Sequence, residues 1–191
     1  MRAPEIETIR QALADNPKKT IDDPSLRPAG VLLVVYPKDG EYCVLLNKRS
    51  QLVEYHKGEI SFPGGSVDPE DGTLLATAIR ETHEEMGILP DDIEYLGDLD
   101  DMPTISHFLI NAFVATIPYP YDFKPSEFEV AEVLEVPISH LRGEASVRSE
   151  SRLRDGIVRT SPTYVYDGHV IFGATAMVLE NFLDILGDAP I

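Results

Sequence analysis

Two Asp-Gly pairs divide parts of this sequence into strands that must run antiparallel. The first pair, Asp39-Gly40, separates VLLVV from YCVLL, and the second, Asp167-Gly168, separates TYVY from HVIF. An Asp-Gly pair supplies the positive φ angles that a tight hairpin turn requires. Each pair therefore predicts two adjacent antiparallel strands.

Three other segments place apolar residues at helical spacing. The first covers residues 4–15, and the last is ATAMVLENFLDILG near the end of the chain. The middle segment follows a cap at Asp71 or Thr73 and stops at Gly87, a residue type suited to the left-handed conformation after a helix. These segments predict helices at the start, middle and end of the chain.

The remaining segments complete the predicted fold. IEYLGDLDDMP and HFLINAFVATIP read as strands, and EVAEVLEVPISHL fits either a strand or a short helix. GEISFPGGSVDPEDG is rich in Gly, Pro and Asp, which predicts a loop apart from an extended piece at residues 60–62. Helices with hairpins between them predict an α/β (α+β) fold, in which a mixed β-sheet lies between helices. A length of 191 residues suits a single domain over residues 26–191, after an N-terminal helix and lead-in over residues 1–25.

The charge excludes several classes of partner. A formal net charge of −17 disfavours nucleic acid and anionic membranes, and no apolar stretch is long enough to span a bilayer. The single cysteine, Cys43, lies in an apolar run and is expected to be a buried thiol. With no signal-peptide pattern at the start, we expect a soluble cytoplasmic protein. An anionic ligand would need a local reversal of charge, by basic residues or by bound metal.

The segment RETHEEMG, residues 80–87, concentrates acidic residues on the middle helix. The apolar residues of this helix form one stripe at about 100° per residue, and the same rotation carries the glutamates to the other side. Glutamates three and four residues apart repel one another unless a cation lies between them. A solvated acidic face is the simpler interpretation of this spacing alone. The three carboxylates predicted on the uncovered side are Glu81, Glu84 and Glu85.

The loop before the helix favours a metal site instead. Mg²⁺ and Mn²⁺ prefer carboxylate and carbonyl oxygens and bridge substrate phosphates. The consecutive glycines of FPGG allow close backbone approach, so a carbonyl of Gly64 or Gly65 can complete the ligand set. Arg80, four residues before Glu84, can hold the carboxylates in orientation.

Taken together, GGSVDPEDGTLLATAIRETHEEMGI resembles the Nudix box of the Nudix hydrolases. In that signature a glycine-rich loop leads to R-E-U-x-E-E-x-G-U, where U is apolar. The chain departs from the general pattern at Thr82, at Gly72, and by one extra residue between the glycines and Arg80. The positions that match are Arg80, Glu81, Glu84, Glu85, Gly87 and Ile88.

The departures resemble the coenzyme A pyrophosphatase-like branch of the family, whose box has this longer loop with an aspartate near position 71. That branch also carries L-L-T-x-R-S-x3-R-x3-G-x-V-x-F-P-G-G, and LLNKRSQLVEYHKGEISFPGG keeps its spacing. Asn47 and Ile60 are mild departures, whereas Glu54 replaces an arginine that could meet an anionic substrate. The likeness covers nearly the whole chain after residue 25.

The resemblance implies a Nudix-type α/β/α sandwich and cleavage of a nucleoside diphosphate derivative with Mg²⁺ or Mn²⁺. The leading substrate is coenzyme A or acyl-CoA, giving 3′,5′-ADP and 4′-phosphopantetheine or its acyl form. Because of Glu54, the alternatives are ADP-ribose, dinucleotides and nucleoside triphosphates. A noncatalytic ligand-sensing module on the same fold is the alternative from another class, and a homodimer is implied by resemblance only.

The match also implies roles for individual residues. Glu81, Glu84, Glu85 and the Gly65 carbonyl are the expected metal ligands, and Arg80 is the expected orienting residue. The base that activates water can be either a glutamate of the box or one from a later loop. Among the later glutamates, Glu129 is the first candidate and Glu132 the second. The alternative for each is an ordinary exposed glutamate. Substrate contact is expected along the upstream motif, at Arg49, Ser50, Gly58, Phe62 and Gly64.

Overall fold

The computed structural model describes residues 3–154 and 157–191, and for residues 152–154 and 157–159 only the backbone is described. The three predicted helices are present, as α1 (Pro4–Asp15), α2 (Leu74–Met86) and α4 (Gly173–Leu186). Two shorter helices, η1 (Pro90–Asp92) and α3 (Ile138–Leu141), lie in connections.

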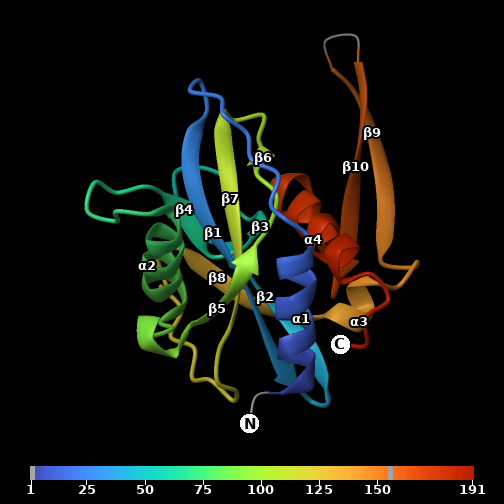
Figure 1. Cartoon of the computed structure of the whole chain (residues 1–191). Helices are drawn as coiled ribbons and strands as arrows, with labels where there is room; N and C mark the ends of the chain where they lie inside the picture. The colour runs from blue at the N-terminus through green and yellow to red at the C-terminus, as the bar shows by residue number, and fades with distance from the viewer. Residues whose placement is uncertain (1–2, 155–156) are drawn as a thin grey trace.

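The main sheet is mixed, as predicted (Figure 1). Strand β1 (Arg27–Lys38) pairs antiparallel with β2 (Glu41–Arg49) and parallel with β7 (Phe108–Thr116). The order across the sheet is β3-β2-β1-β7-β5. In addition, β4 pairs with β1, β6 pairs with β7 and β8 pairs with β2. The other strands are β3 (Ile60–Ser61), β4 (Gly64–Ser66), β5 (Glu94–Asp98), β6 (Met102–Pro103) and β8 (Val130–Pro137).

Both predicted hairpins are confirmed. Asp39 and Gly40 have φ angles of 52° and 89° between β1 and β2. Asp167 and Gly168 have φ angles of 46° and 79° and join β10 (Ile157–Tyr166) to β11 (His169–Ile171). A third strand, β9 (Val147–Arg154), pairs with β10 to complete a separate three-stranded sheet. The sequence analysis did not predict β9, because VRSESRLR is mostly polar.

The expected loop between β3 and α2 also contains a strand. Residues of β4 pair antiparallel with β1, with Gly65 opposite Gly30. A Cβ atom on Gly30 would lie 2.4 Å from the carbonyl oxygen of Leu74, so glycine at this position lets the start of α2 pack directly on β1. This close approach brings the FPGG loop and the acidic helix together.

Hydrophobic residues fill both faces of the main sheet. Side chains alternate along β1, so that Leu32 and Val34 pack under α2, whereas Leu33 and Val35 pack with α1 and α4. Figure 1 shows α2 on one side of the sheet and α1 and α4 on the other, which confirms the layered arrangement. Cys43 is buried, as expected. Within residues 3–154 and 157–191, none of the helices combines the length and apolar character needed to cross a membrane.

Candidate active site

Helix α2 begins and ends where its capping residues predict. The Thr73 hydroxyl accepts a hydrogen bond from the Ala76 backbone N–H at 3.1 Å, and Gly87 adopts the left-handed conformation at φ 71°. One expectation about its faces is wrong. Glu85 is only 3% exposed, so it lies on the covered side of the helix, with Thr82 and Met86.

Glu85 is buried because polar groups from the sheet reach its carboxylate. The Asn47 amide donates a hydrogen bond to Glu85 Oε2 at 2.9 Å, and the Gly64 N–H donates to the same oxygen at 3.4 Å. Arg49 Nη1 lies 3.7 Å from Glu85 Oε1. Burial raises the pKa of Glu85 to about 8, although Arg49 and Asn47 act in the opposite direction.

Asn47 is itself fixed by a second hydrogen bond, which is partly buried. The Ser61 hydroxyl donates to Asn47 Oδ1 at 2.7 Å, which leaves the amide group of Asn47 directed at Glu85. The sequence analysis noted Asn47 only as a departure from a motif and did not consider Ser61. Their register as partners on β2 and β3 is the structural cause of this contact.

Glu81 lies between the glycine loop and Arg80. A Cβ atom on Gly65 would fall 2.5 Å from Glu81 Oε1, so only glycine leaves room for the carboxylate here. Arg80 Nη2 lies 3.0 Å from the same oxygen. Burial raises the pKa of Glu81, and Arg80 partly opposes that shift. The predicted neighbours Gly65 and Glu81 are therefore brought together.

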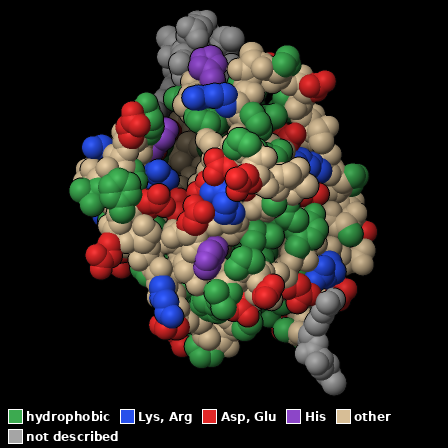
Figure 2. Space-filling view, turned by 90° about the vertical axis from the view of Figure 1, so that its left-hand side faces the viewer, with side chains coloured by type: hydrophobic (Ala, Val, Ile, Leu, Met, Phe, Trp, Pro, Cys, Tyr) green, Lys and Arg blue, Asp and Glu red, His purple; other side chains and the backbone are tan. Residues whose placement is uncertain are grey.

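Arg80 connects the helix to the loop. Its Nη1 donates to Glu84 at 3.1 Å, and its Nε donates to Asp71 at 2.8 Å. Asp71 also accepts a hydrogen bond from the Thr77 hydroxyl, and these bonds, that from Arg80 foremost, hold the pKa of Asp71 well below its usual range. In Figure 2, acidic side chains gather around basic ones near the centre of the α2 side of the molecule, and a hollow lies beside them. Asp71 is thus the residue that fixes Arg80, a role the sequence analysis did not assign.

The outside candidates for the base separate clearly. The negative charge of Glu129 contributes to the raised pKa of both Glu81 and Glu85, after the larger effect of burial. Glu132 instead lies 3.7 Å from Lys48 and 3.2 Å from His169. Of the two outside candidates, Glu129 is therefore the one whose charge acts on Glu81 and Glu85.

The predicted substrate-binding residues occupy different environments. Of these, Arg49 directs its side chain at the carboxylates, and its buried Nε has no hydrogen-bond partner within the described residues. Ser50 is buried, and its hydroxyl donates to the Phe128 carbonyl. Phe62 packs in the hydrophobic core. The two glycines shape loops: Gly58 N–H closes a loop on Arg49 O at 3.0 Å, and Gly64 has a φ of 151°.

The donor set fits Mg²⁺ or Mn²⁺ in its chemistry. Carboxylate oxygens of Glu81 and Glu85 lie beside the glycine loop. Burial raises the pKa of both groups, and neighbouring carboxylates add to each shift, so a bound cation would favour their charged forms. Within the described residues, however, no three acidic, His or Cys side chains already converge on one point. Glu84 contacts Arg80 through one oxygen, Oε2, which lies 3.1 Å from Arg80 Nη1.

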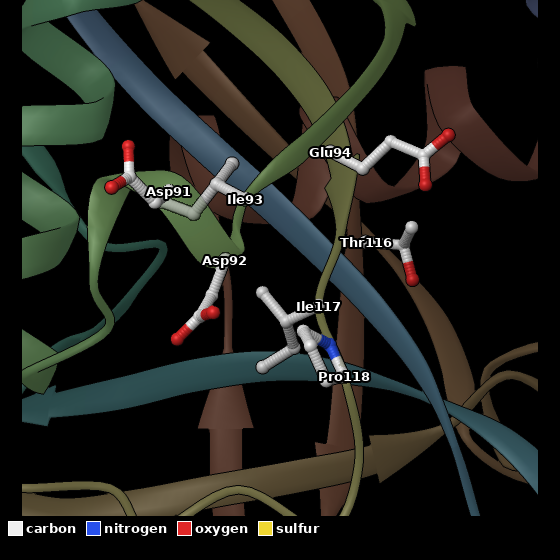
Figure 3. A pocket seen from close by; sticks show the side chains of 7 residues that line it. All are labelled: Asp91, Asp92, Ile93, Glu94, Thr116, Ile117 and Pro118. Carbon is white, nitrogen blue, oxygen red and sulfur yellow. The ribbon is translucent and has the colours of Figure 1, made fainter.

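A separate hollow of about 380 Å³ lies at the η1 end of β5 and β7. Its acidic residues do not form a second metal site. Figure 3 shows the carboxylates of Asp91, Asp92 and Glu94 pointing in different directions. Asp92 accepts a hydrogen bond from the Tyr121 hydroxyl at 2.8 Å, and Glu94 pairs with Arg10 at 2.6 Å.

Comparison with known proteins identifies the family. A model of the NUDIX domain matches residues 26–152, which span the glycine loop and the acidic helix. The chain belongs to the Nudix hydrolase family. It is therefore an enzyme of the class that acts on phosphorus-containing anhydrides.

Among curated relatives, this Nudix hydrolase is similar to proteins named NudL, which are described as uncharacterized. NudL of Photorhabdus laumondii is 32% identical over 165 residues, which cover 86% of this chain and 87% of that protein. NudL of Klebsiella pneumoniae is 37% identical over 166 residues, covering 86% of this chain and 85% of that protein.

Solved Nudix structures share the fold. RenU, a Nudix hydrolase from M. smegmatis, aligns with a TM-score of 0.57 at 18% identity, covering 86% of this chain and 88% of RenU. A MutT/nudix family protein from Enterococcus faecalis aligns with a TM-score of 0.53 at 14% identity, covering 98% and 81%. At these identities the likeness concerns the fold alone.

Proposed function

We propose that this enzyme hydrolyses the diphosphate of coenzyme A or acyl-CoA, releasing 3′,5′-ADP and 4′-phosphopantetheine or its acyl form. The observation that carries the proposal is the junction of the motif LLNKRSQLVEYHKGEISFPGG with the acidic helix. Asn47 and Arg49 from the start of this motif, and Gly64 from its end, all lie against Glu85. The motif that points to coenzyme A is therefore built into the same site as the Nudix glutamates.

The proposed roles follow from these contacts. Glu81, Glu84, Glu85 and the Gly65 carbonyl would hold Mg²⁺ or Mn²⁺. When bound, such an ion supplies positive charge to the diphosphate and lowers the pKa of a coordinated water. Arg80 keeps Glu81 and Glu84 oriented from its own anchor on Asp71.

Glu129 and Arg49 complete the proposed set. The charge of Glu129 acts on Glu81 and Glu85, and Glu129 would accept a proton from the attacking water. Arg49 carries a buried N–H without a partner among the described residues, and it would donate to the diphosphate. An anionic substrate of this kind relieves the cost of the unpaired donor.

A substrate panel tests the proposal. Coenzyme A, acetyl-CoA, ADP-ribose, a dinucleoside polyphosphate and a nucleoside triphosphate would each be assayed with Mg²⁺ and with Mn²⁺. We expect the highest kcat/KM for coenzyme A or its acetyl form, with 3′,5′-ADP as a product. The proposal is rejected if coenzyme A turns over no faster than the other compounds.

The side chain of Glu54 favours a second candidate substrate, ADP-ribose. Its exposed carboxylate stands where the branch motif has arginine, and it interacts with the Tyr55 hydroxyl on the same loop. A substrate with fewer negative charges than coenzyme A, such as ADP-ribose, would be repelled less. Preferred turnover of ADP-ribose in the panel would select this alternative.

A further inference from the structure

Two loops beside the proposed active site expose large apolar side chains. Leu52, in the loop between β2 and β3, is 64% exposed, and Phe128, in the turn before β8, is 58% exposed. Exposed apolar residues scattered singly need no explanation, but these two are joined through one residue next to the carboxylates. That residue is Ser50.

Ser50 ties the two loops together. Its hydroxyl donates a hydrogen bond to the Phe128 carbonyl and accepts one from the Leu52 N–H at 3.0 Å. Its own N–H donates to the Glu129 carbonyl at 2.8 Å. The backbones at Leu52 and Phe128 therefore bind the same hydroxyl oxygen, and Ser50 directly follows Arg49, whose Nη1 lies 3.7 Å from Glu85 Oε1.

The same hydrogen bonds determine what this surface can bind. The Ser50 N–H and hydroxyl, the Leu52 N–H, and the carbonyls of Phe128 and Glu129 are all used within the protein. A nucleobase has ring nitrogens and an amino group that need partners when they are buried. An apolar group needs none, so the surface suits an apolar group better than a base.

We propose that Leu52 and Phe128 bind the apolar, branched arm on one side of the substrate diphosphate, namely the pantetheine end of coenzyme A. This inference rests on the proposed function and adds a specificity determinant to it. The gem-dimethyl group of pantetheine lies only a few bonds from the phosphate, just as Leu52 and Phe128 lie only a few residues from Arg49 and Glu129 in the chain. The two residues therefore select the substrate by its arm and not by its adenosine.

Dephospho-coenzyme A and ADP-ribose form a matched pair of substrates for the test. Both carry adenosine on one phosphate, and they differ in the group on the other, which is pantetheine in one and ribose in the other. Phe128→Ala and Leu52→Ala should each lower kcat/KM for dephospho-coenzyme A by about four- to fifteenfold, the effect of one to two buried methyl groups. Turnover of ADP-ribose should stay unchanged, which also shows that Glu129 has kept its position.

Val170→Ala is the control variant. Val170 is 49% exposed on β11 of the separate sheet, and its loss should change neither substrate. An equal fall for dephospho-coenzyme A and ADP-ribose in Phe128→Ala, or no fall for either, would overturn the inference and leave the proposed hydrolase intact. A wild-type enzyme that cleaves ADP-ribose but not dephospho-coenzyme A or coenzyme A would overturn both.

Discussion

Asn47 shows how much a single buried amide contributes to this site. It is 1% exposed and links the Ser61 hydroxyl to the carboxylate of Glu85. A ligand carboxylate that is oriented by such a partner loses affinity for its ion when the partner is removed. In the proposed site, the metal affinity of Glu85 therefore depends on Asn47, which is not itself a metal ligand.

We expect Asn47→Ala to lower Mn²⁺ affinity or kcat/KM by about 10- to 100-fold. Titration of Mn²⁺ by calorimetry, beside activity at several Mn²⁺ concentrations, measures both quantities. Asn47→Thr should recover part of the loss, because a hydroxyl can also donate to Glu85. Asn181→Ala is the control, because that amide bonds Asp100 away from the site; an equal loss there would show a general effect on folding.

Glu85 predicts a pH dependence of stability in the metal-free protein. Burial raises its pKa from 4.5 to about 8. Between these values the folded chain holds a proton that the unfolded chain has released, so the free energy of unfolding falls as pH rises across this window. Melting temperatures in EDTA from pH 5 to pH 8 should therefore decline.

Substitution of the carboxyl group tests this assignment. Glu85→Gln cannot ionise and should flatten the decline, whereas Glu127→Gln, on an exposed side chain, should leave it in place. A slope that is the same in wild type and in Glu85→Gln would assign the pH dependence to other groups.

At the scale of elements, two glycines leave room for α2 to pack closely on the sheet. Substitution of one is expected to affect stability, and substitution of the other to affect activity. A Cβ atom at Gly30 would lie 2.4 Å from a backbone oxygen of α2, whereas a Cβ atom at Gly65 would lie 2.5 Å from the mobile end of Glu81. Gly30→Ala should destabilise the fold by about 1–3 kcal/mol, because backbone must move.

Gly65→Ala should instead reduce activity by at least about tenfold with a small change in melting temperature, because the Glu81 carboxylate is displaced. Thermal melts and kcat/KM measured on both variants separate the two effects. The prediction fails if Gly65→Ala melts as early as Gly30→Ala, since its effect on activity would then reflect unfolding.

The elements that the sequence predicts well are those set by local chemistry. The two Asp-Gly turns and the Thr73 and Gly87 caps act within a few residues, and the structure has each of them. Strand β4 was missed because its glycines, Gly64 and Gly65, form a strand only by pairing with Val31 and Gly30 of β1, which lie far away in the sequence. The burial of Glu85 was missed for the same kind of reason, since Asn47 lies far away in the sequence and helical periodicity carries no information about it.

At the scale of the whole molecule, the net charge of −17 and the glutamates of the proposed site lead us to expect that Mg²⁺ or Mn²⁺ stabilises the folded chain. An ion that binds only the folded chain, at about 100 times its Kd, adds about 2.7 kcal/mol. For a chain of this size that corresponds to a rise in melting temperature of about 5–10 °C.

Thermal melts with EDTA, Mg²⁺ and Mn²⁺ check this prediction. Glu81→Gln should lose most of the increase, whereas Glu127→Gln should keep it. An equal increase in both variants would mean that the ion acts on the general negative charge and not at the proposed site.

The parallel pairing of β1 with β7 also determines which contacts can form while the chain is being synthesised. Strand β1 ends at Lys38, whereas its parallel neighbour β7 ends only at Thr116. On the ribosome, the apolar β1–β2 hairpin emerges before β7. It therefore lacks this partner strand until β7 has left the exit tunnel. Nascent chains that stop before residue 116 should therefore recruit chaperones and resist native folding, because contacts so distant in sequence close last.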